Sequence, residues 1–417
     1  MQTHHCFESI LLATVRGLPS SWRSSTNRAT RVARCRRPIR HLSCRSAFDL
    51  ATNESAGGGP RALSAADHRV TNIKVRWGGR YCHAFRSRYS GRRFIGDIFM
   101  AAVLVGDVGG THVRFGVVDV SQNSSRTVEH RADLAADQFS SFQRALLSYL
   151  DACGFGVAPT IAAIAVAGPV RGGAVKFTNR NWETSEAELR KLGFERALLI
   201  NDFVALACAM PVLNESDWIP IGPQLTEAAD EPITILGAGT GFGVSCLTRF
   251  RGHSLPMATE GGHIGFAPAT DEEVEVLRIL ARRFGHVSIE RALSGPGLEN
   301  LKSVLDELGG YPSEAAAAPD IVARAKAGEA RCKAAVDMFC GIFGGVAGDF
   351  ALAHGARGGV YIAGGIAHNL DLTHSAFRAQ FESKGRLSYY VSPIPTRLIT
   401  NENAAFLGAA QAAIEFG

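Results

Sequence analysis

The sequence predicts an α/β fold, and three observations point to it. From residue 101 the chain runs from an apolar strand through a Gly-Gly turn into a second strand with alternating apolar residues. Strand and helix patterns then follow one another as far as residue 211, which favours a mixed sheet. From residue 233 the order of strand, Gly-rich turn and strand returns, and mostly helical patterns follow it.

The first of these regions begins with the apolar residues 101–105 and reaches Asp107 at the end of its first strand. Gly109 and Gly110 make the turn, and residues 113–120 form the alternating strand. Further along this region, the patterns predict strands at 126–132, 161–167, 174–178 and 197–200 and a helix at 136–153.

The second region opens with a strand at 233–236 and then becomes mostly helical. Thr270 followed by Glu273 predicts a capping box at the start of a helix. Residues 334–353 are almost wholly apolar, but four glycines and Asp349 favour a buried helix over a membrane span. Asn401 is the expected N-cap of an Ala-rich last helix that ends at Glu415.

The first 99 residues have a different charge from the rest of the chain. They contain 18 Lys and Arg against 5 Asp and Glu, whereas the remainder contains 26 basic and 34 acidic residues. Because the remainder offers no basic stripe, we exclude nucleic acid as a partner. Segment 1–99 is upstream sequence before a start at Met100, an organelle transit peptide or a disordered basic tail. We favour the first, because the densest Arg run begins only after residue 30, and we expect the segment to be dispensable.

The cysteines and the hydropathy of the sequence further restrict the class of protein and its expected compartment. None of the nine cysteines forms a Cys-x-x-Cys pair, so metal and redox motifs of that kind are absent from the sequence. Isolated thiols fit a reducing compartment. No apolar run reaches the roughly 18 residues of a membrane span. We therefore expect a soluble, cytoplasmic protein with no membrane partner.

Three Gly-rich junctions follow apolar strands and suit phosphate binding, because residues without side chains let backbone N–H groups approach an anion. Each alone is as well explained by a simple turn, but together they indicate a nucleotide cradle. Asp107 is placed to hold Mg²⁺, directly or through water. Neither hairpin is a Walker loop or a dinucleotide fingerprint, since each leads into a strand. The expected nucleotide-binding residues are Gly106, Asp107, Gly109, Gly110, Thr111, Gly237, Gly239, Thr240, Gly241, Gly364 and Gly365.

Polar residues at two other places suit a sugar. Asn201 and Asp202 end the strand at 197–200, where α/β sheets carry their sites, although either residue could simply cap the next helix. Glu260, His263 and Glu290 offer acceptors and donors for the hydroxyls of a polyol. The structural alternatives are a core histidine for His263 and an ion pair with a neighbouring arginine for Glu290.

In combination these motifs resemble the bacterial glucokinase family of the hexokinase, actin and Hsp70 ATPase superfamily. The resemblance covers residues 101–417 and is specific because the motifs keep the family's order. The matching segments are Leu104–Thr111, Ala167–Val170, Thr178-Asn179, Ile200–Phe203, Gly237–Gly241, Glu260–His263, Leu293–Gly297 and Ala363–Gly365.

The resemblance implies a two-lobed ribonuclease-H-like (actin-like ATPase) fold with a ligand cleft between the lobes. The small α/β lobe comprises 101–211 plus 396–417, and the large lobe comprises 212–395. The implied activity is that of an ATP:glucose 6-phosphotransferase with Asp202 as general base and Mg²⁺ held near Asp107 through water. We also expect a homodimer. The residues implied to bind glucose are Asn179, Asn201, Glu260, His263 and Glu290.

The chain departs from the family pattern at two points, and some alternatives stay open. His112 stands where the family usually has Asn, and Ala258-Thr259 replace a common Pro-Gly pair. The hexose range and the donor, ATP or polyphosphate, are not fixed. A non-catalytic sugar-sensing regulator of the same fold is the alternative function. If the sugar site is as implied, replacing Glu290 or His263 should weaken sugar binding and leave ATP affinity intact.

Overall fold

A computed structural model describes residues 73–77, 80–84, 102–120, 127–155, 159–177, 180–250, 253–312 and 314–416. Within the first 99 residues it contains one antiparallel pair, β1 (Ile73–Trp77) and β2 (Arg80–Ala84). We assigned no strand there, yet Ile73–Trp77 alternates apolar with basic residues, which is the two-residue period of a strand. The remaining expectations for segment 1–99, like Asn179 and the Thr178 before it, lie outside the described residues.

The first of two large sheets has five strands in the order β5-β4-β3-β6-β9. β3 pairs antiparallel with β4 and parallel with β6, and β9 continues the parallel part. Val103, Leu104 and Val105 of β3 are fully buried, as expected for a central strand covered on both faces. The strands are β3 (Ala102–Val108), β4 (His112–Asp119), β5 (Val128–Ala135), β6 (Ile161–Val166) and β9 (Arg196–Asn201).

The second large sheet repeats this arrangement in the order β10-β15-β14-β11-β12-β13. Here β11 pairs antiparallel with β12 and parallel with β14, just as β3 pairs with β4 and β6. The internal repeat that we read from two Gly-rich turns is therefore a repeat of sheet topology. The strands are β10 (Trp218–Pro220), β11 (Ile233–Ala238), β12 (Phe242–Phe250), β13 (His253–Ala258), β14 (Gly359–Ala363) and β15 (Thr396–Ile399).

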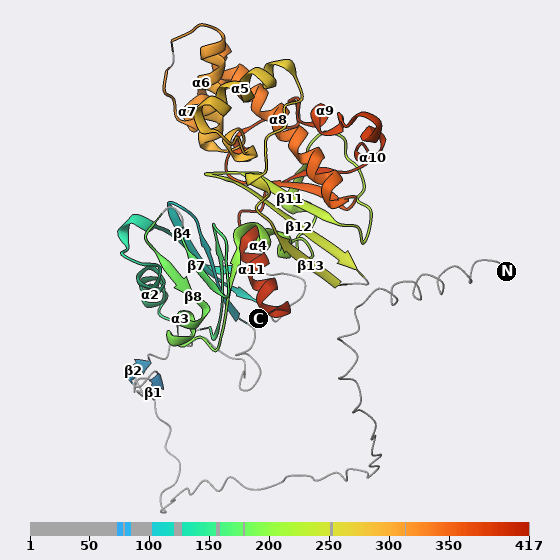
Figure 1. Ribbon diagram of the computed structural model, residues 1–417. Helices are drawn as coiled ribbons and strands as arrows, with labels where there is room; N and C mark the ends of the chain where they lie inside the picture. Colours follow the sequence, from blue (N-terminus) through green and yellow to red (C-terminus); the bar gives the residue numbers. More distant parts are fainter. Residues whose placement is uncertain are drawn as a thin grey trace, which may run out of the picture. The chain divides into compact units, whose positions relative to one another are not determined.

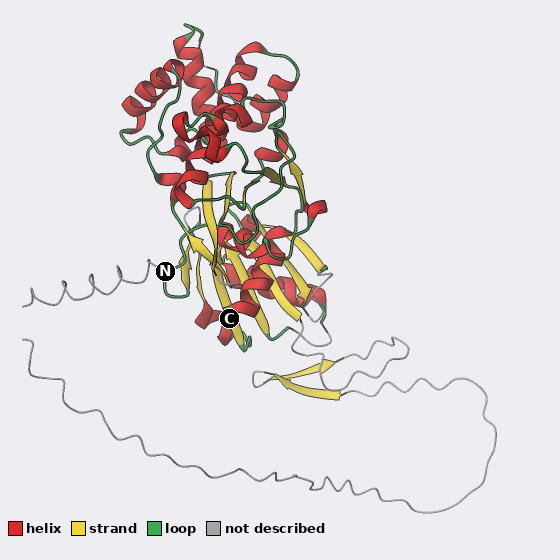
Figure 2. Cartoon of the chain, turned by 90° about the vertical axis from the view of Figure 1, so that its right-hand side faces the viewer, coloured by secondary structure: helices red, strands yellow, loops and turns green. Residues whose placement is uncertain are grey.

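Two helices pack against each other between the sheets, and the others cover the outer faces. α4 (Asp202–Ala209) and α11 (Ala404–Glu415) lie side by side between the two sheets (Figure 1). Helices α5 to α10 gather on the far side of the six-stranded sheet (Figures 1 and 2). The outer helices are α2 (Phe142–Cys153), α3 (Glu186–Lys191), α5 (Asp271–Phe284), α6 (Gly295–Leu308), α7 (Ala318–Lys326), α8 (Ala330–His354), α9 (Phe377–Glu382) and α10 (Ser388–Val391).

The hydrophobic core is divided into three parts by this layering. The central part joins inner residues of both sheets to α4 and α11. These two helices cross closely at Gly408, where a Cβ would lie 1.7 Å from the carbonyl oxygen of Ala205. The other two parts lie behind each sheet. The position of α4 matters for function, because its first residue is Asp202.

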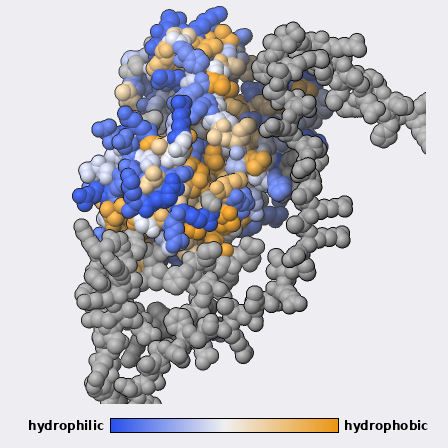
Figure 3. Space-filling model, turned by 60° about the horizontal axis from the view of Figure 1, so that its bottom comes forward, coloured by the Kyte–Doolittle hydropathy of each residue, from blue (hydrophilic) through white to orange (hydrophobic). Residues whose placement is uncertain are grey.

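On the side drawn in Figure 3, the described surface is mixed. Hydrophobic residues lie between hydrophilic ones and do not form one continuous apolar face. By length and composition alone α8 could cross a membrane, and it is the one such helix among the described residues. Most of its side chains are nevertheless buried, including Phe339 and Phe343, which confirms the predicted core helix.

Several boundaries differ from the sequence predictions. The helix expected at 136–153 begins only at Phe142, because Ser141 caps it by accepting a hydrogen bond from the Arg144 N–H. The last helix begins at Ala404, and Asn401 instead bonds the Asn403 N–H and Asp217. β15 lies in the six-stranded sheet although residues 396–399 were assigned to the small lobe, because it pairs with β14.

Candidate active site

The carboxyl ends of parallel strands from both sheets meet at one cavity of about 540 Å³. In α/β sheets this edge is where ligands bind. Gly109 follows β3 as Gly239 follows β11, and Ala167 follows β6 as Gly364 follows β14, so matching positions of the repeated topology line the same cavity. The cavity is lined by Gly109, Gly110, Ala167, Gly168, Pro169, Asn201, Asp202, Phe203, Gly239, Thr240, Gly241, Phe242, Gly243, Val244, Thr259, Glu260, His263, Glu290 and Gly364.

Many of the residues singled out in the sequence line this cavity, but some do not. Gly106 and Gly237 pack against neighbouring strands: a Cβ would lie 2.8 Å from Ile164 at Gly106 and 2.1 Å from the Ala363 oxygen at Gly237. Close packing between strands explains why glycine stands at these two positions. Thr111 and Gly365 follow lining residues in the chain and Asp107 lies near Asp202, but none of these three lines the cavity.

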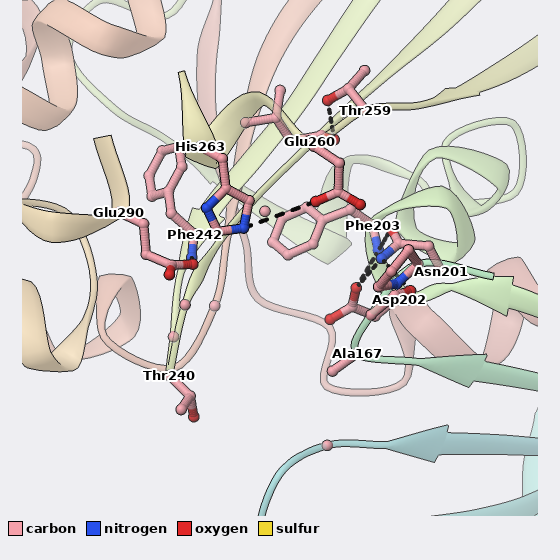
Figure 4. A pocket seen from close by; sticks show the side chains of 18 of the residues that line it. Ala167, Asn201, Asp202, Phe203, Thr240, Phe242, Thr259, Glu260, His263 and Glu290 are labelled. Carbon is pink, nitrogen blue, oxygen red and sulfur yellow. Dashed lines mark hydrogen bonds and ion pairs between the residues drawn. The ribbon is translucent and has the colours of Figure 1, made fainter. Parts of the chain in front are cut away.

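Asp202 lies at the first position of α4, and its neighbour Asn201 is the N-cap. The Asn201 side-chain oxygen accepts hydrogen bonds from the N–H groups of Phe203 and Val204 at 3.0 and 3.2 Å. Asp202 accepts from the Phe203 N–H at 3.0 Å and from the Asn201 amide at 2.9 Å. The capping function predicted as an alternative thus belongs chiefly to Asn201. One Asp202 carboxylate oxygen is held in place, and the residue faces the cavity (Figure 4).

The pKa of Asp202 is raised to about 7, chiefly because the carboxyl group is removed from water and secondly because Asp107 carries a nearby negative charge. Hydrogen bonds from Phe203 and Asn201 oppose this rise. A carboxylate with a pKa near neutrality is a much better proton acceptor at neutral pH than an ordinary aspartate.

Asp107 lies at the inner end of a row of charged groups at the first hairpin. Arg114 bonds Asp107 at 3.4 Å and Asp133 at 3.1 Å, and His112 bonds Asp133 at 2.8 Å. Burial raises the pKa of Asp107, while the Arg114 guanidinium acts in the opposite direction. His112, the departure from the family pattern, therefore acts on a neighbouring carboxylate and lies at the outer end of this row.

The second hairpin is held by its own backbone and by Glu290. The Gly239 N–H donates to the Gly241 oxygen at 2.8 Å, and the Gly295 N–H donates to the Gly239 oxygen at 2.8 Å. Glu290 accepts a hydrogen bond from the Phe242 N–H at 2.9 Å. The alternative of an ion pair with a neighbouring arginine does not describe it, since Arg291 lies over the Phe284 ring.

Glu260 and His263 face each other across one turn that also lines the cavity, with 4.0 Å between Oε2 and Nε2 (Figure 4). His263 is 60% exposed, so it is not a core histidine. Thr259 fixes this turn: its hydroxyl donates to the Val244 oxygen at 2.7 Å and accepts from the Gly261 N–H at 3.2 Å. The second departure from the family pattern thus supplies two local hydrogen bonds.

Several lining residues were given no role in the site from the sequence. Ala167, Gly168 and Pro169 belong to a segment that matches the family, and they follow β6, the strand between β3 and β9, at the edge where α/β sheets bind ligands. Phe203, which ends another matching segment, and Phe242, Gly243 and Val244 were likewise given no role; they line the cavity where α4 packs against β12.

The family model and two proteins similar to this chain all carry the description glucokinase. A family model described as Glucokinase matches residues 104–415. The glucokinase of Caulobacter sp. (strain K31) is 47% identical over 312 residues, which cover 74% of this chain and 94% of that protein. A glucokinase structure from an Antarctic psychrotroph is 34% identical, with a TM-score of 0.68 over 75% of this chain and 99% of that one.

A more distant structure has the same fold. A ROK family glucokinase from Streptomyces griseus, in complex with glucose and AMPPNP, is 17% identical with a TM-score of 0.52 and covers 75% of this chain and 99% of that one. At this identity the similarity shows the fold alone. It confirms the two-lobed, actin-like architecture expected from the sequence.

Proposed function

The chain belongs to the glucokinase family, and on this premise we propose that it phosphorylates the 6-hydroxyl of glucose with ATP. The observation that carries the proposal is the position of Asp202. It faces the cavity between the two glycine hairpins and the polar group formed by Glu260, His263 and Glu290. A proton acceptor thus lies where a sugar and a nucleotide would meet.

In the proposed reaction the oxygen of the sugar hydroxyl attacks the terminal phosphorus of ATP. The O–H proton passes to the Asp202 carboxylate, and the bond between phosphorus and the ADP oxygen breaks. Phosphoryl transfer of this kind depends on alignment and charge stabilisation more than on covalent help from the protein. Asn201 contributes by orienting Asp202, because its amide holds one carboxylate oxygen at 2.9 Å.

The two hairpins are the proposed phosphate-binding elements. Gly109 and Gly110 come from the first, and Gly239, Thr240 and Gly241 come from the second. Glycine backbones at these positions allow N–H groups to approach phosphate oxygens closely. Gly364 lines the cavity after β14 and would offer its backbone to the nucleoside; a glycine is needed there because φ is 94° and a Cβ would lie 2.3 Å from the Ala238 oxygen.

Mg²⁺ fits this site as a companion of the nucleotide. Among the described residues no group of three or more His, Cys, Asp or Glu side chains could hold a metal by itself. Mg²⁺ in kinases is usually held by one or two carboxylates together with substrate phosphates, and Asp107, next to the first hairpin, is the carboxylate that would hold it here, directly or through water. When bound, the ion would neutralise negative charge on the phosphates.

The proposed sugar ligands are Glu260, His263, Glu290 and Asn201, together with Asn179. Carboxylate oxygens accept hydrogen bonds from sugar hydroxyls, and a neutral imidazole can donate or accept. The non-catalytic sensor is less well supported, because a sensor requires neither a proton acceptor with a raised pKa nor two phosphate hairpins. Turnover decides between the two.

Replacing Asp202 with Asn tests the proposal directly. We expect turnover to fall about 10²- to 10⁴-fold, the usual effect of removing a general base. The fold should be kept, because the Asn side-chain oxygen can still accept from the Phe203 N–H. Asp217→Asn is the matched control, since Asp217 caps a turn by accepting from the Asn214 N–H at 2.8 Å and does not line the cavity. Wild-type turnover in folded Asp202→Asn would contradict the mechanism.

The dependence on pH gives a second arm of the same test. Because Asp202 must be ionised to accept a proton, the acid limb of kcat/KM should have its midpoint near the raised pKa of about 7. The contribution of Asp202 to the free energy of unfolding should fall as pH rises, whereas kcat/KM should rise. The folded-state pKa lies above the ordinary 3.8, so protonation stabilises the fold at low pH, and this is lost as pH rises through about 7. Asp202→Asn should therefore melt above the wild type at about pH 8. An acid limb near pH 4 would contradict the assignment.

A further inference from the structure

Glu290 touches the phosphate hairpin as well as the proposed sugar site. Its Oε2 accepts a hydrogen bond from the Phe242 N–H at 2.9 Å. A Cβ at Gly241 would lie only 2.5 Å from the same oxygen, so the hairpin fits closely against this carboxylate (Figure 4). Glu260 and His263 pair with each other, and within the described part of the site neither side chain forms a hydrogen bond or an ion pair with residues 239–243.

The main chain around Glu290 is itself fixed. The Ser294 hydroxyl donates to the Glu290 carbonyl at 2.8 Å and accepts from the Gly297 N–H at 2.9 Å, where it caps α6. The Gly295 N–H then donates to the Gly239 oxygen at 2.8 Å. Segment 290–295 is thus joined to the hairpin at both ends, by one side chain and by one backbone bond.

A carboxylate can serve both ligands at once. Its two oxygens offer about four lone-pair positions, and the Phe242 N–H uses one of them. A sugar hydroxyl bonded to the same group would restrict the side chain and with it the hairpin that it holds. Coupling of this kind is reciprocal, so each ligand must raise the affinity of the other by the same factor.

We propose that Glu290 is a positioning residue that links the sugar site to the phosphate hairpin at residues 239–243, so that sugar and nucleotide bind cooperatively through it. This rests on the proposed function and revises the expectation that replacing Glu290 leaves ATP affinity intact. His263, whose side chain pairs with Glu260 and not with a hairpin residue, keeps that expectation.

The test measures binding of a non-hydrolysable ATP analogue by calorimetry, with and without saturating glucose, in the full chain. We expect Glu290→Ala to weaken analogue binding roughly two- to tenfold even without glucose, as for the loss of one hydrogen bond. The ratio between the two affinities should fall to about one, whereas the wild type should show a coupling of about fivefold or more. Glu290→Gln keeps an acceptor oxygen, so its analogue affinity and its coupling ratio should lie between those of the wild type and of Glu290→Ala.

His263→Ala is the matched control. It should weaken glucose binding, leave analogue binding without glucose at the wild-type value, and keep the wild-type coupling ratio. The proposal is overturned if Glu290→Ala binds the analogue as the wild type does without glucose, or if His263→Ala loses the coupling equally. The first comparison needs no sugar binding, so it decides even if the alanine variant binds no glucose. Wild-type protein that turns over no glucose would instead overturn the proposed function, and this inference with it.

Discussion

The two glycine hairpins have similar sequences but are stabilised in different ways. The first closes with a bond from the Gly109 N–H to the His112 oxygen at 3.0 Å, and charged side chains hold its flanks. Arg180, for example, donates to the Gly110 oxygen at 2.9 Å. The second is pressed against backbone and rings: a Cβ at Gly243 would lie 1.9 Å from the Phe203 ring.

This difference shows that a motif specifies a turn but not what surrounds it. The charged flanks of the first hairpin are partly exposed, so individual contacts there should contribute little to stability. The second hairpin lies among buried strands, where packing tolerates few changes. Substitutions of a strand glycine beside the second hairpin and of a turn glycine in the first can therefore test the comparison.

The largest expected contrast is between Gly237→Ala and Gly109→Ala. A Cβ at Gly237 would lie 2.1 Å from the Ala363 oxygen of the adjacent strand, so β11 and β14 would have to separate. We expect a loss of about 3 kcal/mol in the free energy of unfolding, at the upper end for overpacking. At Gly109 the nearest atom is 3.7 Å away, so the change should stay within about 0.5 kcal/mol. Equal losses in urea unfolding would remove the contrast.

Arg114→Met examines the charged side of the comparison. Burial already raises the folded-state pKa of Asp107, and Arg114 opposes that rise, so the variant should raise it further. A raised folded-state pKa means that stability is lost as pH rises through it. We expect a destabilisation of about 1 kcal/mol at about pH 8 that shrinks towards about pH 4, as Asp107 becomes protonated. The loss is small because Arg114 is partly exposed.

The control for that variant is Arg190→Met, which removes an exposed pair with Glu186 at 3.8 Å in the same lobe. The small loss of unfolding free energy in Arg190→Met should be the same at both pH values, unlike the loss in Arg114→Met. Denaturant unfolding at the two pH values decides between the outcomes. A pH-independent loss at Arg114 would mean that the side chain acts by packing alone, and the charged description of the first hairpin would be wrong.

Much of the fold is predictable because its signals are local. Both sheets begin with an apolar strand and a glycine turn, and these signals fix β3, β4, β11 and β12. What the sequence cannot predict depends on distant partners. β15 joins the six-stranded sheet by pairing with β14, and Asn401 is taken out of a helix cap by Asp217, which lies 184 residues away.

The site follows the same division. Asn201, Asp202 and the hairpin glycines are found by their place after apolar strands, which is local information. Ala167 to Pro169 line the same cavity but carry no reactive side chain, so nothing chemical marks them in the sequence. The contact between Glu290 and the Phe242 N–H joins residues 48 positions apart and emerges only when the lobe is folded.

The smallest expected effect is that of His112→Asn, which restores the residue usual in the family. His112 and Asp133 are 55% and 43% exposed and bond at 2.8 Å. Burial alone would raise the pKa of Asp133, but hydrogen bonds from His112 and Arg114 lower it on balance. An Asn amide can still donate to Asp133, and exposed pairs contribute at most about 1 kcal/mol, so unfolding should change by about 0.5 kcal/mol or less. That small change should vanish between about 0.1 M and about 1 M salt, as the Debye length falls from about 10 Å to about 3 Å. A loss above about 1 kcal/mol that persists at high salt would show that the first hairpin depends on His112 as firmly as the second depends on its packing.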